Sequence, residues 1–278
     1  MFTTKNSNLL IVSLSLSALS AGCGGGAINF PSGSSSDLTS GGGALVDPLI
    51  ALQQQALTQN ESTGGSGAPI DSGTATSFVL FQNNWTTGTP NRAAGSVVQN
   101  GLSNPYSMGA YVDANDSFKT KILVVDRGNH RVLIFNDIPN DSTDQPDVVV
   151  GQAGFNSGVV HGGLGSINSA GLNSPVHVTV CANGQMFIAD SSNHRVLGYN
   201  QVPQSNGATA DFVIGQPGFT TGTANNGVGV GGITQDQRLN GPYAVHCISN
   251  KLFIVDRNNR RVLVYNTCLL YKSPNQRD

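Results

Sequence analysis

Two histidines are the residues of this sequence whose types and spacing are best suited to chemistry. His177 lies two residues after Pro175 and His246 lies four residues after Pro242, each in a strand-like segment. Aligned on the prolines, the two positions are two residues apart, and residues two apart on a strand face the same way. Two imidazoles on one face could bind a metal ion or act as an acid–base pair. No carboxylate accompanies them and no third ligand is visible, so a polar lining without a reaction is the alternative. We assign no catalytic residue, metal site or cofactor.

Six charged residues recur in register and form a second candidate set. The leading aspartates are 64 and then 66 residues apart, and an arginine follows each of them after five residues. Such a recurrence indicates a repeat architecture. Because every unit has one copy, we expect a structural turn, with the aspartate accepting amide hydrogen bonds and the arginine pairing with a carboxylate or carbonyl. The six residues are Asp126, Arg131, Asp190, Arg195, Asp256 and Arg261.

Short antiparallel strands must position these residues. An apolar segment ends at each aspartate and another begins at each arginine, with a D-x-x-N turn between them that suits a hairpin. A third segment follows each proline. A fourth ends in Gln, at residues 78–82, 148–152 and 212–216. Gly, Ser, Thr and Asn are abundant and Glu61 is the lone glutamate, which disfavours helices. Four strands per unit predict an all-β fold built of propeller blades.

The turn sequence resembles the NHL repeat. The N-H-R-V core of that repeat stands intact at residues 129–132 and 193–196, and the third copy has Arg260 in place of histidine. The likeness covers residues 77 to 266, in units of about 77–146, 147–210 and 211–278. It implies a β-propeller, commonly of about six blades. The family includes extracytoplasmic binding modules, RNA-binding domains and a lyase that makes peptide amides with channel-lining histidines on a metal. The likeness therefore implies a fold and leaves the activity open.

Three units are too few to close a ring, because propellers usually have at least about four blades. After Asn266 the sequence does not return to the proline and the G-Q strand that follow the first two copies. We therefore hypothesise a truncated or frame-shifted gene. The alternative is a half-propeller that pairs with another chain as a homo-oligomer, since an open ring leaves unpaired strand edges.

The front of the chain resembles an export signal of the bacterial lipoprotein type. Lys5 precedes a short apolar run at residues 9–20, and small residues precede Cys23, where such signals are cleaved and the thiol is lipidated. Ser20 stands where an aliphatic residue is usual, so ordinary secretion is the alternative. Residues 1–22 would be the signal, and residues 23–76, rich in Gly, Ser and Thr, a flexible tether. We expect an outer-membrane lipoprotein facing the periplasm or the cell surface.

Charge and loop length narrow the choice of partners. A net charge of −2 and a pI near 6.2 provide no basic field for phosphates, so we expect no nucleic-acid binding. The long connections 153–173 and 217–240 could form a rim that binds a protein, peptide or glycan, or could simply pack through Phe155 and Phe219. The leading expectation is a non-enzymatic binding scaffold; the alternative is a metal-dependent lyase or hydrolase that uses His177 and His246 in the channel.

One cysteine pair is also left open by the sequence. Cys181 and Cys247 end two equivalent strand segments, and Cys268 makes the number after Cys23 odd. A disulfide between Cys181 and Cys247 is allowed in an oxidising compartment but is not required there.

Overall fold

The computed structural model describes residues 78–84, 86–227 and 238–267, which belong to a compact unit that begins at Ala75. The expected signal segment, the lipidation site Cys23 and the tether lie outside the described residues, as does Cys268. Within the described ranges, none of the helical segments is long and apolar enough to cross a membrane.

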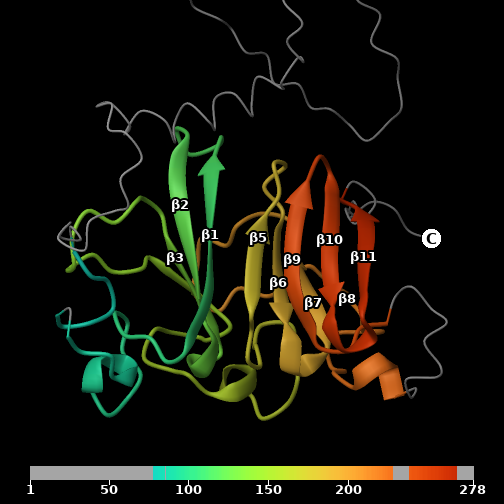
Figure 1. The fold of residues 1–278 in the computed structure, drawn as a ribbon, viewed down its shortest axis with the longest axis horizontal. Helices are drawn as coiled ribbons and strands as arrows, with labels where there is room; N and C mark the ends of the chain where they lie inside the picture. Colours follow the sequence, from blue (N-terminus) through green and yellow to red (C-terminus); the bar gives the residue numbers. More distant parts are fainter. Residues whose placement is uncertain (1–77, 85, 228–237, 268–278) are drawn as a thin grey trace, which may run out of the picture. The chain divides into compact units, whose positions relative to one another are not determined.

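The described residues form three antiparallel sheets, which confirms the all-β expectation (Figure 1). Neighbouring strands in each sheet are consecutive in the chain. The first sheet contains β1 (Pro105–Asp113), β2 (Lys119–Asp126), β3 (Arg131–Phe135) and β4 (Val148–Val150). The second contains β5 (His177–Val180), β6 (Met186–Asp190), β7 (Arg195–Tyr199) and β8 (Phe212–Ile214). The third contains β9 (Pro242–Ile248), β10 (Lys251–Asp256) and β11 (Arg261–Asn266).

A short 3-10 turn joins the two strands of one hairpin in each sheet: β2 to β3, β6 to β7 and β10 to β11. The turns are η2 (Arg127–Asn129), η4 (Ser191–Asn193) and η7 (Arg257–Asn259). Each turn ends in a left-handed residue, His130, His194 or Arg260, with φ of 52°, 51° and 54°. One turn of 3-10 helix followed by a left-handed residue reverses the chain, so each aspartate pairs in register with its arginine. We call the end of the sheets at which these turns lie the turn end, and the opposite end the far end.

The fourth strands pair differently from the expected units. β4 pairs with β3 and β8 pairs with β7, so each G-Q strand completes the sheet before it and not the sheet after it. The physical reason is proximity, since the Asp147 N–H already donates to the Ile134 carbonyl at 2.8 Å as the chain returns along β3. Residues 78–82 have no preceding hairpin among the described residues and form no strand. Phe81 instead packs edge-on against Phe135, with ring centroids 5.8 Å apart.

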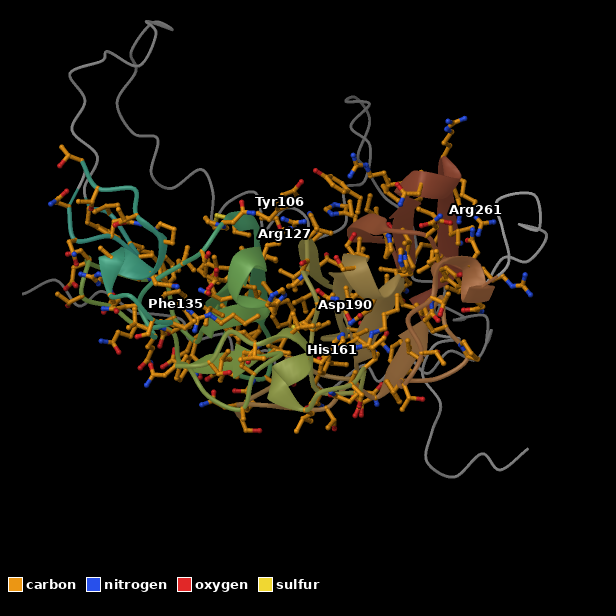
Figure 2. The ribbon with its side chains drawn as sticks, turned by 90° about the horizontal axis from the view of Figure 1, so that it is seen from below. Tyr106, Arg127, Phe135, His161, Asp190 and Arg261 are labelled. Carbon is orange, nitrogen blue, oxygen red and sulfur yellow. A yellow bond between two sulfur atoms is a disulfide. The ribbon has the colours of Figure 1, made fainter. Side chains whose placement is uncertain are left out.

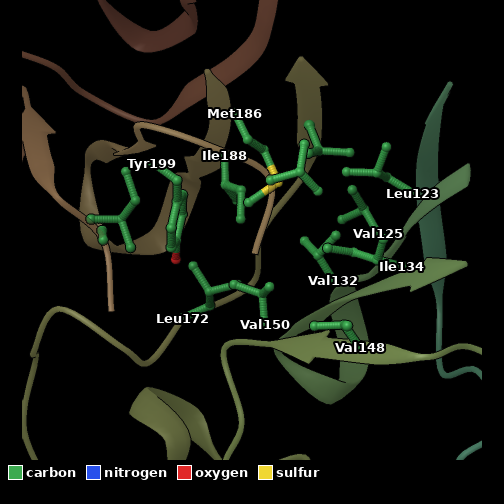
Figure 3. Packing of buried hydrophobic residues seen from close by; sticks show 14 residues of the cluster. Leu123, Val125, Val132, Ile134, Val148, Val150, Leu172, Met186, Ile188 and Tyr199 are labelled. Carbon is green, nitrogen blue, oxygen red and sulfur yellow. The ribbon is translucent and has the colours of Figure 1, made fainter. Parts of the chain in front are cut away.

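The hydrophobic core lies between the sheets. Alternate residues of a strand face opposite neighbours, so each sheet contributes one face to each interface. Leu123, Val125, Val132 and Ile134 of the first sheet pack against Val178, Met186, Ile188, Leu197 and Tyr199 of the second (Figure 3). Phe187, Ala189 and Val196 of the second pack against Val245, Leu252 and Ile254 of the third. The middle sheet is therefore buried on both faces, which explains the nearly continuous apolar runs of β6 and β7.

Two further 3-10 segments lie in the long connections, η3 (Val160–Gly163) and η5 (Ala224–Gly227), and η1 (Pro90–Ala93) precedes the first sheet. Each contains a residue with positive φ whose side chain contacts the asparagine of the D-x-x-N turn that follows: Asn91, His161 or Asn225. These segments therefore share one geometry although their sequences differ.

Candidate functional site

The recurring aspartates are buried at the turn end, and each accepts three hydrogen bonds. Asp126 Oδ2 accepts from Arg131 Nε at 2.7 Å and from Asn129 Nδ2 at 2.8 Å, and its Oδ1 accepts from the Ser103 N–H at 2.7 Å. The second copy repeats this set around Asp190 and the third around Asp256, with every distance between 2.7 and 2.8 Å. These carboxylates have internal partners on both oxygens.

The recurring arginines use their remaining N–H groups on loop carbonyls. Arg131 donates to the carbonyls of Val98, Gly101 and Phe155. The equivalent Arg195 donates to Asn168, Gly171 and Phe219 at 2.9, 3.0 and 2.7 Å. The third, Arg261, donates to the Arg238 carbonyl at 2.5 Å. Each arginine thus ties a long connection to a hairpin, which satisfies buried backbone carbonyls.

The asparagine of each D-x-x-N turn contacts one residue of the 3-10 segment that precedes its sheet, η1, η3 or η5. Asn129 Nδ2 donates to Asn91 Oδ1 at 2.8 Å, and Asn259 Nδ2 donates to Asn225 Oδ1 at 2.8 Å. In the middle unit the loop partner is a histidine: His161 takes the place of Asn91 and Asn225, and its Nε2 lies 3.1 Å from Asn193 Oδ1. Sequence reasoning missed these three loop positions. The signal that could have found them is a leucine three residues before each proline, because its carbonyl accepts a hydrogen bond from the backbone N–H of the same loop residue; these leucines are Leu102, Leu172 and Leu239.

The histidines of the N-H-R-V core connect neighbouring sheets. His130 Nδ1 accepts a hydrogen bond from the Ser174 N–H at 2.9 Å, and His194 Nδ1 accepts one from the Gly241 N–H at 3.0 Å. Burial lowers the pKa of both imidazoles, and Asp190 opposes that effect in each case. The neutral form is the one that can accept these bonds, so burial and geometry favour the same protonation state.

The structure aligns His177 and His246 in the register expected from the sequence. His177 pairs with Ala189 one residue before the aspartate, and His246 pairs with Phe253 three residues before it. The two imidazoles interact electrostatically across β5 and β9: burial first, and then the His246 charge, lower the pKa of His177. His177 Nδ1 is buried and has no hydrogen-bond partner among the described residues, while His246 is exposed.

The described residues place no metal-ligand set around this pair. In the part of the chain that the structure describes, no group of three or more His, Cys, Asp or Glu side chains is placed to hold a metal ion. The two histidines alone offer an imidazole pair of unequal exposure.

A disulfide joins the second and third sheets. Cys181 follows β5 and Cys247 lies in β9, and the two are bonded with their Cα atoms 5.1 Å apart. The sequence allowed this pairing without requiring it. The bond crosses the interface that also contains the second hydrophobic cluster, in which Cys181 is buried.

No family model and no curated protein matches the chain. Among solved structures, an auxiliary nutrient binding protein from Bacteroides thetaiotaomicron VPI-5482 is similar over 56% of this chain and 36% of that chain, with 16% sequence identity and a TM-score of 0.34. The chain thus spans little more than a third of the length of that protein.

Proposed function

We propose that the chain is an NHL-type β-propeller segment of an exported cell-envelope protein, and that it acts as a binding scaffold for a protein or peptide, with a glycan as the other ligand class. It would be held to the membrane only through lipid on Cys23. Three sheets with one repeated turn support the NHL assignment, as do His130 and His194, which make the same bond to the next unit.

One observation carries the choice of a scaffold over an enzyme. The residues that recur in every unit, led by Asp126, Asp190 and Asp256, direct their polar atoms to internal partners. A carboxylate that accepts three hydrogen bonds inside the fold is not available as a base or a metal ligand. The recurring turns therefore stabilise the fold, and we assign ligand recognition to residues that differ between the units.

A second candidate function rests on His177 and His246. The lowered pKa of His177 favours a neutral imidazole, which is the form that binds a metal ion or accepts a proton. A metal-dependent lyase or hydrolase would need a further ligand from residues outside those described.

The experiment that separates the two uses the mature protein on a peptide array and a glycan array, followed by metal analysis. The scaffold predicts retention of a ligand without turnover, and the same retention by the His177→Ala, His246→Ala double variant. Stoichiometric zinc, calcium or iron that is lost in this double variant would overturn the scaffold in favour of the enzyme. Binding to neither array would also count against the scaffold.

The anchor is tested separately. We expect the mature N-terminus to carry lipid on Cys23, and Cys23→Ser to release the protein from the membrane fraction. An unlipidated N-terminus elsewhere in the chain would favour ordinary secretion.

A further inference from the structure

Four residues at the turn end break the repeat in the same way. The first and third units carry a tyrosine at the start of the proline strand and an arginine directly after the aspartate, whereas the middle unit has small or apolar residues there. The four residues are Tyr106, Arg127, Tyr243 and Arg257, and their counterparts in the middle unit are Val176 and Ser191. We call the four the Tyr–Arg cluster.

The cluster is assembled from strands that are far apart in the sequence. The Tyr106 and Tyr243 hydroxyls lie 2.6 Å apart, and their rings meet edge to face with centroids 5.8 Å apart. The Arg127 guanidinium lies over the Tyr106 ring at 5.4 Å, and the Arg257 guanidinium lies over the Tyr243 ring at 5.0 Å. Figure 2, which views the turn end, shows Tyr106 and Arg127 lying together there. Two equivalent arginine–tyrosine pairs, one from the first sheet and one from the third, therefore contact each other beside β5 of the middle sheet.

Strand irregularities present both tyrosines. In β1 the register passes from Pro105 to Ser107, and in β9 it passes from Pro242 to Ala244, so each tyrosine is the extra residue of a β-bulge. A bulge leaves its extra residue unpaired and redirects the side chain, and bulges are frequent next to functional sites. Tyr106 remains 42% exposed, so its ring and hydroxyl are accessible to a ligand.

The charges of the cluster are not neutralised within the described part of the chain. Neither Arg127 nor Arg257 has a carboxylate within ion-pair distance there, and the buried Nε of Arg127 has no hydrogen-bond partner among the described residues. The turn-end aspartates are buried and already paired with other arginines.

Acidic residues gather instead at the far end. There, two lysines form ion pairs with Asp113, Asp116 and Asp137. Further aspartates lie in the connections that leave β3 and β7: Asp141, Asp144, Asp147 and Asp211. The turn end is thus the basic end of these sheets, although the net charge of the chain is −2.

We propose that the Tyr–Arg cluster binds carboxylate side chains of an acidic segment in a protein partner. A guanidinium matches a carboxylate with two parallel N–H donors, and contact with an aromatic ring holds it in a fixed orientation. The paired hydroxyls add a donor between the two arginines. Each tyrosine ring already contacts a guanidinium and the other ring, so little of its face is left for a sugar ring to stack on. The cluster therefore presents mainly hydrogen-bond donors to a ligand, which favours an acidic peptide over a glycan. This inference rests on the proposed scaffold function and identifies its partner.

The test measures binding of a labelled oligoglutamate peptide to the mature protein by fluorescence anisotropy at low and at physiological salt. We expect Arg127→Gln with Arg257→Gln to weaken binding at least about tenfold, since a charge-assisted hydrogen bond contributes about a factor of ten or more. Tyr106→Phe with Tyr243→Phe keeps the rings and should cost less, about threefold. Added salt should weaken the wild-type protein more than the arginine variant.

The matched control removes the same charge at the far end. Lys119 pairs with Asp137 and Lys251 donates to Asn266 Oδ1 at 3.0 Å. Lys119→Gln with Lys251→Gln should change affinity less than about twofold, because exposed charges so far from the Tyr–Arg cluster are largely screened. Urea unfolding of each variant checks that the fold is intact. Equal losses in the two double variants, no binding by the wild-type protein, or tighter binding of oligogalacturonate than of oligoglutamate would overturn the inference.

Array binding by the arginine double variant separates this inference from the scaffold proposal. If an array ligand binds the arginine variant as tightly as it binds the wild-type protein, the scaffold stands and the Tyr–Arg cluster is not its site. If no ligand is retained by any form of the protein, both proposals fail.

Discussion

The second and third sheets are built from nearly the same sequence but have different surroundings. All five residues of β7 are buried, whereas burial in β11 alternates along the strand. Val196 and Val262 occupy equivalent places directly after the arginine; Val196 is fully buried and Val262 is 56% exposed. The same holds for the residue before the aspartate, where Ala189 is buried and Val255 is 37% exposed.

The turns themselves do not differ in this way. The third turn reproduces the hydrogen bonds of the second to within about 0.1 Å. What differs is the neighbour: one face of the second sheet packs on the third, and no described residue covers the equivalent face of the third. A repeat therefore encodes its hairpin locally but obtains its burial from the next unit, as in other repeat proteins. Unit-to-unit interfaces, and not single sheets, are the stabilising elements.

The largest expected difference in stability between the second and third sheets comes from Arg195→Ala, which leaves Asp190 buried without its counter-ion. Both side chains are fully buried, and loss of one partner of such a pair costs about 3–5 kcal/mol. Arg261→Ala is the matched control, since the Arg261 side chain is 25% exposed and we expect about half the loss. Urea unfolding measures both. Equal losses would mean that the third sheet is as well covered in solution as the second.

The next effect concerns the disulfide-bonded interface between the second and third sheets. Cys181 and Cys247 close a loop of 66 residues between the second and third sheets. Replacing both with Ser should lower the free energy of unfolding by about 2–4 kcal/mol through loop-closure entropy. The interface between the first and second sheets relies on packing and hydrogen bonds, so reductant should leave it unchanged. Amide hydrogen exchange then should rise in β9 to β11 and not in β1 to β3, and a uniform rise would contradict this assignment.

Repetition made much of this arrangement predictable. The Asp126, Arg131 and Asn129 set recurs in sequence, so its turn could be expected before any contact was known. The all-β class and the two-residue offset between the strand positions of His177 and His246 followed from the same alignment. These features are local, since their partners lie within a few residues or at equivalent places in the repeat.

Features that depend on partners far along the chain could not be predicted. The bond from Ser174 to His130 spans 44 residues, and the contact of Tyr106 with Tyr243 spans 137. Nor could the sequence decide which hairpin a G-Q strand would join, because short apolar strands fit either neighbour until the sheets are placed. The outcome, β4 on β3, depends on the path of the chain at the far end.

A smaller effect compares the two equivalent valines directly. Val196→Ala removes two buried methyl groups and should cost about 2 kcal/mol, whereas Val262→Ala should change stability by less than about 0.5 kcal/mol. Thermal or urea unfolding of the two variants at several protein concentrations measures the difference. A loss at Val262 that grows with protein concentration would show that a second copy of the chain covers this face.

The smallest effect is a pH dependence confined to the contacts between sheets. Burial lowers the pKa of His194, and the unfolded value is about 6.5, so below that pH the unfolded chain binds a proton that the folded state resists. The stability from this histidine is therefore present above about pH 6.5 and is lost as pH falls through the lowered folded pKa. His194→Asn removes the titration at a left-handed position that asparagine tolerates. The His194→Asn variant should have a free energy of unfolding about 1 kcal/mol lower than the wild-type protein at pH 8. On acidification the two curves of unfolding free energy against pH should converge. Arg260→Asn, at the equivalent place in the third sheet, should show no such convergence, because that position has no imidazole to remove. His177 shifts in the same direction but is present in every form, so it cancels in the differences. Parallel curves for His194→Asn and the wild-type protein would mean that the bond from Gly241 does not depend on the neutral imidazole.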